Sequence, residues 1–253
     1  MLTTQRKQLL LARLQQDGQI VAKAFSEELG ISEDTVRRDL RELAAEGRLQ
    51  RVHGGALPAS AAVGNLQARE QLAPEDKRAL GRAGAALVLP GQVVILDGGT
   101  TSLQVVQHLP LDLRATVVTH SPTVAVALAG HAQVEVLMLG GRLFRHSMVN
   151  VGASVVEAAA QLRVDLYLMG VTGVHAETGL TTGDFEEAAV KRALHQRAAE
   201  TVVLASLDKL GTASPFSVAP LRELAALVVP AATPQSLRKK LQAGGAKVEI
   251  AAG

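Results

Sequence analysis

The sequence of 253 residues contains no cysteine. This absence excludes disulfide bonds, thiolate metal ligands and cysteine nucleophiles. Aromatic residues make up only 2% of the chain, with no Trp and one Tyr. A nucleic-acid site built on stacked aromatic side chains is therefore not expected. The seven histidines are scattered, without a His-Glu-x-x-His or His-x-His pattern, so no metal site and no cofactor are predicted.

Long apolar runs are also lacking. No run reaches the roughly 18 residues that a membrane span needs, and residues 1–7 lack the apolar centre of a signal peptide. We therefore expect a soluble cytoplasmic protein with no membrane partner. Hydrophobic residues make up 47% of the chain, which is enough for a packed core of mainly Leu, Val and Ala. The length accommodates one large or two ordinary domains.

Charge gives little general information, because the net charge is only +2. Residues 1–57 contain nine Lys/Arg and eight Asp/Glu, so neither part of the chain is strongly basic. The basic character is concentrated between Ile31 and Gly55. Overall charge would not by itself indicate a nucleic-acid partner.

The segment between Ile31 and Gly55 predicts a helix followed by a tight hairpin. Ser32 is a suitable N-cap, and Val36, Leu40 and Leu43 form a buried stripe at spacings of four and three. The opposite side of this helix carries Arg37, Arg38 and Arg41, with Thr35 at its edge. An apolar back and a front of guanidinium groups are typical of a DNA-recognition helix. The alternative is a solvated charged face without a partner.

The elements around this helix favour the DNA-binding interpretation. Residues 4–16 and 22–29 predict two further helices, with an extended stretch at 19–21 between them, and the third helix spans 31–46. A helix-turn-helix followed by a hairpin is a winged helix-turn-helix, whose wing contacts the DNA backbone. Arg51 and His53 in the hairpin are placed for phosphate or minor-groove contact. His53 could instead be an ordinary loop histidine.

Residues 32–43 and 47–56 closely resemble the N-terminal domain of the DeoR family of bacterial transcriptional regulators. The resemblance is carried by Ser-Glu-Asp-Thr-Val-Arg-Arg-Asp-Leu-Arg-Glu-Leu and by Gly-Arg-Leu-Gln-Arg-Val-His-Gly-Gly-Ala. It implies that residues 1–57 bind double-stranded operator DNA, and that Asp39 orients an arginine. The predicted DNA-binding residues are Ser32, Thr35, Arg37, Arg38, Arg41, Arg51 and His53.

Residues 58–73 read as a linker of small residues. From 74 to 253 the sequence alternates between Val/Leu-rich strands and helices. This alternation is typical of an α/β domain with a mainly parallel sheet covered by helices. In such sheets ligands bind at the carboxyl ends of the strands.

The loop from Asp97 to Ser102 follows a predicted strand and opens a predicted helix. Glycines allow close approach of the backbone, and the helix N-terminus offers free N–H groups, so this loop can hold a phosphate. The alternative is a tight strand-to-helix turn that merely needs glycine. Residues 119–121, 140–142, 170–173 and 206–209 also fall at strand ends. Glu187 and Lys191 lie four residues apart on one helix face, where they could equally form a surface pair.

The segment from 74 to about 230 resembles the DeoR-family effector domain, which is related to ribose-5-phosphate isomerase and to coenzyme A transferases. The resemblance implies a phosphorylated sugar as ligand. It assigns sugar hydroxyls to Asp97 and the phosphate to Gly99, Thr100 and Thr101. It places Arg142, Glu187, Lys191 and Lys209 at the mouth of the binding site. The complete predicted site is Asp97, Gly98, Gly99, Thr100, Thr101, Thr119, Gly141, Arg142, Glu187, Lys191 and Lys209.

Two positions depart from the family pattern. His120 stands where Asn is usual, and Ala205-Ser206-Leu207-Asp208-Lys209 replaces Ala-Asp-x-Ser-Lys, so the acid has moved by two positions. The expected function is a sugar-phosphate-responsive repressor that acts as a homodimer or homotetramer and is not an enzyme. An isomerase-like enzyme and a transcriptional activator are the alternatives.

Overall fold

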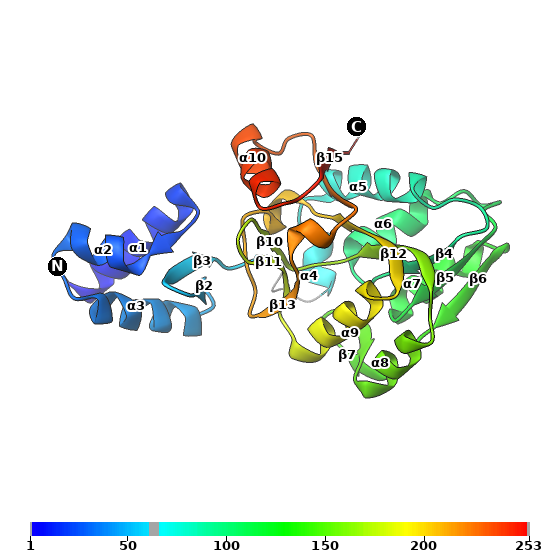
Figure 1. Cartoon of the computed structure of the whole chain (residues 1–253), viewed down its shortest axis with the longest axis horizontal. Coiled ribbons are helices and arrows are strands. Elements are labelled where there is room, and N and C mark those ends of the chain that lie inside the picture. Colours follow the sequence, from blue (N-terminus) through cyan, green and yellow to red (C-terminus); the bar gives the residue numbers. More distant parts are fainter. Residues whose placement is uncertain (1, 61–65, 252–253) are drawn as a thin grey trace.

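The computed structural model describes residues 2–60 and 66–251. Figure 1 shows a small region of helices at one end and a larger region of helices and strands at the other. We call residues 3–58 the N-terminal unit and residues 74–250 the body. None of the described helices is long and apolar enough to cross a membrane.

The N-terminal unit has three helices around a small apolar core. They are α1 (Thr3–Asp17), α2 (Ala22–Leu29) and α3 (Glu33–Ala45). An antiparallel sheet in the order β1-β3-β2 completes the unit, formed by β1 (Ile20–Val21), β2 (Leu49–Val52) and β3 (Gly55–Pro58). The buried core consists of Leu10, Leu14, Ile20, Ala22, Phe25, Val36, Leu40, Leu43, Leu49 and Ala56. This is the winged helix-turn-helix that the sequence predicts.

The recognition helix α3 begins at Glu33, two residues later than the sequence predicts. The reason is local, because Ser32 occupies the N-cap position and its Oγ accepts a hydrogen bond from the Thr35 N–H at 3.3 Å. Val36, Leu40 and Leu43 are buried in the core, as their spacing predicts. The face that carries the arginines is therefore directed away from the core.

The body is built on a seven-stranded parallel sheet in the order β15-β14-β12-β9-β4-β5-β6. The strands are β4 (Val93–Leu96), β5 (Ala115–Thr119), β6 (Val134–Met138), β9 (Val164–Met169), β12 (Ala198–Leu204), β14 (Ala226–Val229) and β15 (Val248–Ile250). Every pair of neighbouring strands in this sheet is parallel. The predicted α/β class is therefore confirmed.

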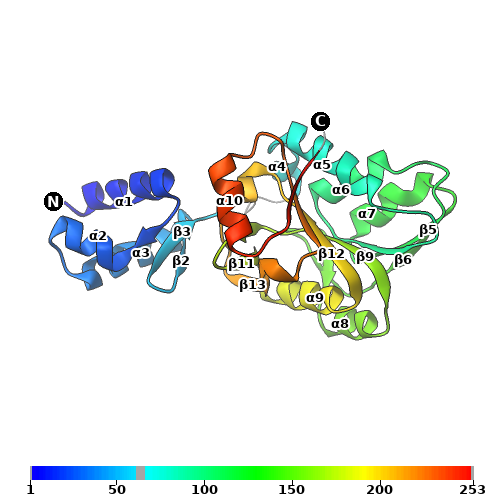
Figure 2. The same ribbon diagram turned by 45° about the horizontal axis from the view of Figure 1, so that its top comes forward.

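Helices cover both faces of this sheet, as Figure 2 shows. The helices are α5 (Pro74–Ala86), α6 (Thr100–His108), α7 (Pro122–Ala127), α8 (Ala153–Ala160), α9 (Phe185–His195) and α10 (Gln235–Ala243). Leu80 of α5, Val105 of α6 and Val124 of α7 share one buried cluster. Ala159 of α8, Leu194 of α9 and Leu241 of α10 belong to a second cluster. The sheet thus has an apolar core on each side.

The sequence did not predict two small antiparallel sheets in the body. One joins β7 (Arg142–Phe144) to β8 (Val149–Val151), and the other has the order β10-β11-β13. The strands of the second sheet are β10 (Gly173–His175), β11 (Gly179–Thr182) and β13 (Phe216–Ala219), and three short 3₁₀ helices are η2 (Leu128–Gly130), η3 (Leu207–Lys209) and η4 (Leu221–Glu223). Strands this short carry too few residues to show a period of two.

The end of β3 and the segment that follows it lie against the body. Ala213 N–H donates to the Pro58 carbonyl oxygen at 3.3 Å, and Ser60 Oγ donates to the Thr172 carbonyl oxygen at 2.5 Å. Ala59 forms an isolated parallel bridge with Ala213. A short helix, α4 (Leu66–Glu70), precedes the body. Residues 61–65 of the predicted linker lie outside the described residues, and the boundaries 57/58 and 73/74 stay predictions.

Candidate DNA-binding surface and effector pocket

The three arginines of α3 are exposed. Arg37 donates two hydrogen bonds to Glu33 Oε1, at 3.0 and 2.7 Å, and Arg41 Nε donates to the Arg37 carbonyl oxygen at 3.4 Å. Among the described residues, Arg38 has no hydrogen-bond or ion-pair partner. Its guanidinium group is therefore available for an external acceptor without breaking a bond inside the protein.

Asp39 does orient an arginine, but the arginine belongs to another helix. The Asp39 carboxylate is completely buried and receives both Nε and Nη2 of Arg6 on α1, the second at 3.1 Å. The prediction that Asp39 orients an arginine is therefore confirmed, and that arginine is Arg6. The bidentate pair fixes α1 against α3.

The hairpin between β2 and β3 brings its own cations beside α3. Arg51 and His53 are exposed, and together with Arg37 they line a groove of about 150 Å³. Gly55 permits this arrangement, since a Cβ atom there would lie 1.7 Å from the Ile20 carbonyl oxygen. Of the predicted helix residues, Arg37 thus shares this groove with both predicted wing residues. Their contact with DNA stays a prediction.

In the body, the predicted phosphate loop connects β4 to α6. Gly99 adopts a φ of +116°, a backbone angle that residues with a side chain rarely adopt. The residues at the start of α6, whose N–H groups have no partner within the helix, line a cavity of about 40 Å³. Gly98, Gly99, Thr100 and Thr101 line this cavity together with Glu187, Lys191 and Lys209. The structure therefore brings seven of the predicted effector-binding residues together. We call this cavity the anion pocket.

The anion pocket contains several cationic side chains with almost no solvent. Lys77, Lys191 and Lys209 line it and are 3%, 2% and 8% exposed. Burial lowers the pKa of Lys209 to about 8 and also lowers the pKa of Lys77. Among the described residues, the Lys209 ammonium group has no hydrogen-bond or ion-pair partner. A bound anion would supply the missing counter-charge.

The Thr101 hydroxyl is a second polar group in the anion pocket that a ligand could bind. Its side chain is buried, lines the anion pocket, and its Oγ1 has no hydrogen-bond partner among the described residues. Buried hydroxyl groups normally find a partner, because an unpaired one costs free energy. An oxygen-rich ligand would provide it.

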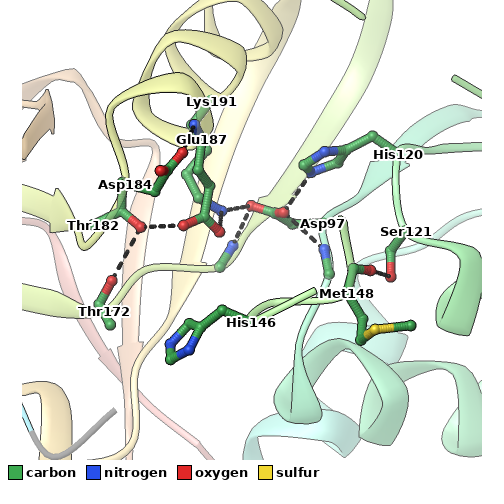
Figure 3. A network of polar contacts seen from close by, with 12 residues as sticks. Asp97, His120, Ser121, His146, Met148, Thr172, Thr182, Asp184, Glu187 and Lys191 are labelled. Atoms are coloured by element: carbon green, nitrogen blue, oxygen red, sulfur yellow. Dashed lines mark hydrogen bonds and ion pairs between the residues drawn. The ribbon is translucent and has the colours of Figure 1, made fainter. Parts of the chain in front are cut away.

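Asp97 does not line the anion pocket but lies beneath it, with no exposed surface. Lys191 Nζ approaches one carboxylate oxygen at 2.6 Å and His120 Nε2 approaches the other at 2.8 Å (Figure 3). Tyr167 Oη and the N–H groups of Gly98 and Gly170 also donate to this carboxylate. Its acceptor sites are thus occupied by the protein, and the structure does not support the predicted contact of Asp97 with sugar hydroxyls.

The charges around Asp97 stabilise one another. Burial alone would raise the pKa of Asp97, but the charge of Lys191 and the hydrogen bond from His120 lower it well below its usual range. Burial alone would lower the pKa of Lys191, but Asp97 and Glu187 raise it. Lys191 is therefore held charged in the floor of the anion pocket. The Glu187 carboxylate, 3.6 Å away, belongs to this buried network, so the surface-pair alternative is wrong.

Three further predicted residues lie outside the anion pocket. Thr119 is buried and accepts a hydrogen bond from the Ser121 N–H at 3.1 Å. Gly141 packs against Val155, and a Cβ atom there would come within 2.6 Å of it. The exposed side chain of Arg142 pairs with Glu186 on the protein surface. For these three the predicted ligand contact has no geometric support, because neither of the two cavities near α9 includes them.

The anion pocket also contains residues that the sequence did not predict. The side chains with polar groups are Arg69, Lys77, Ser102, Ser147, Thr172, Thr182 and Asp208. Lys77 could have been found, because it shares a helix face with Leu80, Gly81 and Gly84, which are all buried. A lysine on the inner face of a helix needs a functional or structural explanation. Arg69 had no such signal, since it lies in the predicted linker.

The two departures from the family pattern lie next to this pocket. His120 Nδ1 is 2.8 Å from the Asn150 carbonyl oxygen, so this side chain joins β5, β4 and β8 through two acceptors. Ser206 Oγ donates to Asp208 Oδ1 at 2.5 Å, and Asp208 lines the anion pocket. The displaced acid therefore still reaches the cavity.

An exposed arginine-bearing helix with a wing, joined to an α/β body that contains a cationic pocket, defines a DNA-binding transcriptional regulator with a sensor domain. Residues 6–61 match the DeoR-like helix-turn-helix domain, and residues 72–230 match the DeoR C terminal sensor domain. The chain belongs to the DeoR family. It is a regulator of transcription and not an enzyme, as the sequence predicts.

Curated relatives align over nearly the whole chain. The HTH-type transcriptional regulator GlpR of Haloferax volcanii is 33% identical over 251 residues, covering 98% of each chain. The HTH-type transcriptional repressor GlcR of Bacillus subtilis is 33% identical and covers 87% of this chain and 85% of its own. The glycerol-3-phosphate regulon repressor of Escherichia coli is 26% identical over 94% of this chain and 95% of its own.

Solved structures show weaker likenesses. Ribose 5-phosphate isomerase A of Methanocaldococcus jannaschii has a TM-score of 0.40 and 18% identity, with 54% of each chain covered. The sorbitol operon regulator SorC of Klebsiella pneumoniae has a TM-score of 0.40 and 14% identity, covering 94% of this chain and 98% of its own. These values carry no information about the ligand.

Proposed function

We propose that the chain represses an operon of sugar metabolism and that a phosphorylated sugar in the anion pocket releases the repression. One observation carries the proposal. Four cationic side chains line this pocket, and the carboxylates among its described lining residues are those of Glu187 and Asp208. Lys191 is also paired with the buried Asp97, so one positive charge stays in excess. A phosphate monoester carries a charge of about −1.5 to −2 at pH 7, which would balance this excess.

Each part of the pocket has a role in this proposal. The N–H groups at the start of α6 and the hydroxyls of Thr100 and Thr101 bind the phosphate oxygens, and Lys209 supplies charge. Asp208 and Glu187 are the carboxylates that can accept hydrogen bonds from sugar hydroxyls. Asp97 positions Lys191 and does not contact the ligand. The relative named as a glycerol-3-phosphate regulon repressor supports a phosphorylated ligand.

DNA binding is assigned to the N-terminal unit. Thr35, Arg37 and Arg38 read bases, while Ser32, Arg41, Arg51 and His53 contact the backbone. We propose residues 1–57 as the DNA-binding domain, 58–73 as the linker and 74–253 as the effector-sensing and oligomerising domain. Two or four copies in the cytoplasm would present N-terminal units to repeated half-sites of the operator. The effector releases DNA only if it binds more tightly to an arrangement unsuited to those half-sites.

The test is fluorescence anisotropy on the DNA upstream of the protein's own gene, at fixed salt, with a panel of sugar phosphates. We expect specific binding that one compound of the panel releases. The double variant Thr100→Val/Thr101→Val should bind DNA normally and lose the response, because valine keeps the shape and removes both hydroxyls. A normal response in that variant would contradict the proposed phosphate position.

A cell-free transcription assay then fixes the direction of regulation. Repression that the same compound relieves is the expected result. Stimulation of transcription by the DNA-bound protein would identify an activator, the alternative that the sequence left open. No specific DNA binding under any condition would contradict the proposal as a whole.

A further inference from the structure

A second cavity adjoins the anion pocket and extends toward the N-terminal unit. Ser147, Thr172 and Glu187 line both cavities, so the two share a wall. The second cavity has a volume of about 430 Å³, compared with about 40 Å³ for the anion pocket. We call it the interdomain cavity, because residues of the N-terminal unit and of the body line it together.

The anion pocket is too small for an entire phosphorylated sugar. One water molecule needs at least ~10–15 Å³ of cavity volume. The anion pocket, with about 40 Å³, therefore holds only about three water-sized groups. Pockets for small molecules usually measure about 300–1,000 Å³. The interdomain cavity reaches that size and shares lining residues with the anion pocket. A ligand whose phosphate lies at the start of α6 must therefore place the rest of its atoms elsewhere, and the shared wall leads into the interdomain cavity.

The far wall of the interdomain cavity is formed by the N-terminal unit. Ala44 comes from the last turn of α3, Gly47 from the turn that follows it, and Leu49 and Gln50 from β2. On the side of the body, the lining residues include Phe144, His146, Ala213, Ser214 and Pro215. Apolar walls with a few polar groups suit a sugar, whose C–H faces and hydroxyls need both kinds of contact.

Direct hydrogen bonds hold the two sides of the interdomain cavity together. Thr172 lines it and accepts the hydrogen bond from Ser60, and Ala213 lines it and donates to Pro58. Of their partners, Pro58 is the last residue of β3, and Ser60 lies in the segment that follows it. Thr172 Oγ1 also donates to Thr182 Oγ1, which in turn donates to Glu187 Oε2 at 2.6 Å (Figure 3). The shared wall is thus a continuous set of hydrogen bonds from Glu187 on α9 to Ser60, in the segment that follows β3.

We propose that the effector spans both cavities, so that the DNA-binding domain itself forms part of the effector site. This inference rests on the proposed function. The phosphate occupies the anion pocket, and the carbon chain passes Glu187 to contact the end of α3 and the start of β2. The effector class is then a phosphorylated sugar or polyol of five or more carbons. A three-carbon phosphate ester has fewer atoms beyond the phosphate, and we expect it to end before it contacts the N-terminal unit.

The inference is tested on the whole chain by calorimetric titration with glycerol 3-phosphate and with six-carbon sugar phosphates, including fructose 1-phosphate, fructose 6-phosphate and glucose 6-phosphate. The variant Ala44→Leu fills the interdomain cavity from the N-terminal unit. We expect it to weaken the best six-carbon ligand about tenfold, because overpacking a filled site is unfavourable, and to leave glycerol 3-phosphate unchanged. Ala45→Leu, the same change at the exposed neighbouring residue, is the matched control and should bind both ligands like the wild type.

A second variant guards against damage to the fold. Gln50→Ala enlarges the cavity and removes its amide group, so it should weaken the six-carbon ligand several-fold without affecting glycerol 3-phosphate. Wild-type affinity for the six-carbon ligand in Ala44→Leu and Gln50→Ala would overturn the inference and leave the proposed function intact. If no sugar phosphate binds the wild type, both the inference and the proposed effector are overturned.

Discussion

The molecule has two sets of cationic side chains in opposite environments. On α3, Arg37, Arg38 and Arg41 are exposed, whereas Lys191 and Lys209 in the body are almost completely buried. Exposed cations keep their hydration until a polyanion displaces counterions, so their effect depends strongly on salt. Buried cations have lost their hydration and need a partner in a fixed position. The first environment suits DNA, and the second suits one small anion.

The largest expected effect comes from breaking the buried set. Lys191→Ala removes the ammonium partner of Asp97 and leaves a completely buried carboxylate whose remaining partners are hydrogen-bond donors such as His120 and Tyr167. We expect the free energy of unfolding to fall by about 3–5 kcal/mol, measured by urea denaturation. Arg37→Ala, which breaks an exposed ion pair with Glu33, is the control and should not change stability measurably. Equal losses in the two variants would remove the distinction between the two sets.

The exposed set should affect DNA binding and not stability. Arg38→Ala is expected to weaken operator binding by about 1–3 kcal/mol if its guanidinium group forms a bidentate contact with guanine. Anisotropy titrations at several salt concentrations measure this change. Arg82→Ala, at an exposed arginine of the body, should leave the affinity unchanged. An unchanged affinity and base preference in Arg38→Ala would exclude the proposed role.

The buried set should also give the effector response a pH dependence. The pKa of Lys209 is lowered to about 8 by burial, while Asp208 raises it and the charges of Lys77, Arg69 and Lys191 lower it further. The ammonium group is therefore charged at pH 7 and neutral at pH 9, whereas a phosphate monoester with a second pKa near 6 keeps its charge throughout. We expect phosphate-ester affinity to fall by up to about tenfold over this interval.

The matched control for this pH dependence is Lys209→Arg, because an arginine stays charged at pH 9. This variant should bind the phosphate ester with an affinity that changes much less between pH 7 and pH 9. Calorimetry in buffers of equal ionic strength measures both proteins. A wild-type affinity that stays constant, or an equal fall in the variant, would show that Lys209 does not supply the charge.

The smallest expected effect is that of replacing Arg142, which the family resemblance and the structure place at different sites. The resemblance puts Arg142 at the mouth of the effector site, but its exposed side chain pairs with Glu186 outside the anion pocket. We expect Arg142→Ala to leave effector affinity within the error of the titration. A loss comparable to that of the Thr100→Val/Thr101→Val variant would favour the placement expected from the sequence.

Local signals were sufficient for much of the fold. The bounds of α2 agree with those predicted, and Ser32 caps α3 as expected. The strand-to-helix loop at Asp97 was found because glycines and hydroxyls follow a buried strand, a pattern that a phosphate loop shares with an ordinary tight turn. All these features depend on residues that are neighbours in the sequence, where propensity, capping and periodicity act.

The tertiary structure alone decided which side chains line the anion pocket. Asp97 and Lys191 are 94 positions apart, and their contact withdraws Asp97 from the pocket. Arg69 reaches the pocket because α4 packs beside α6, which no local pattern reveals. The interdomain cavity likewise exists only because the chain after β3 is hydrogen-bonded to the body. Sequence patterns thus determined the elements and the family, while burial and long-range pairing determined the roles of the charged groups, because the surroundings of a charge are set by contacts distant in sequence.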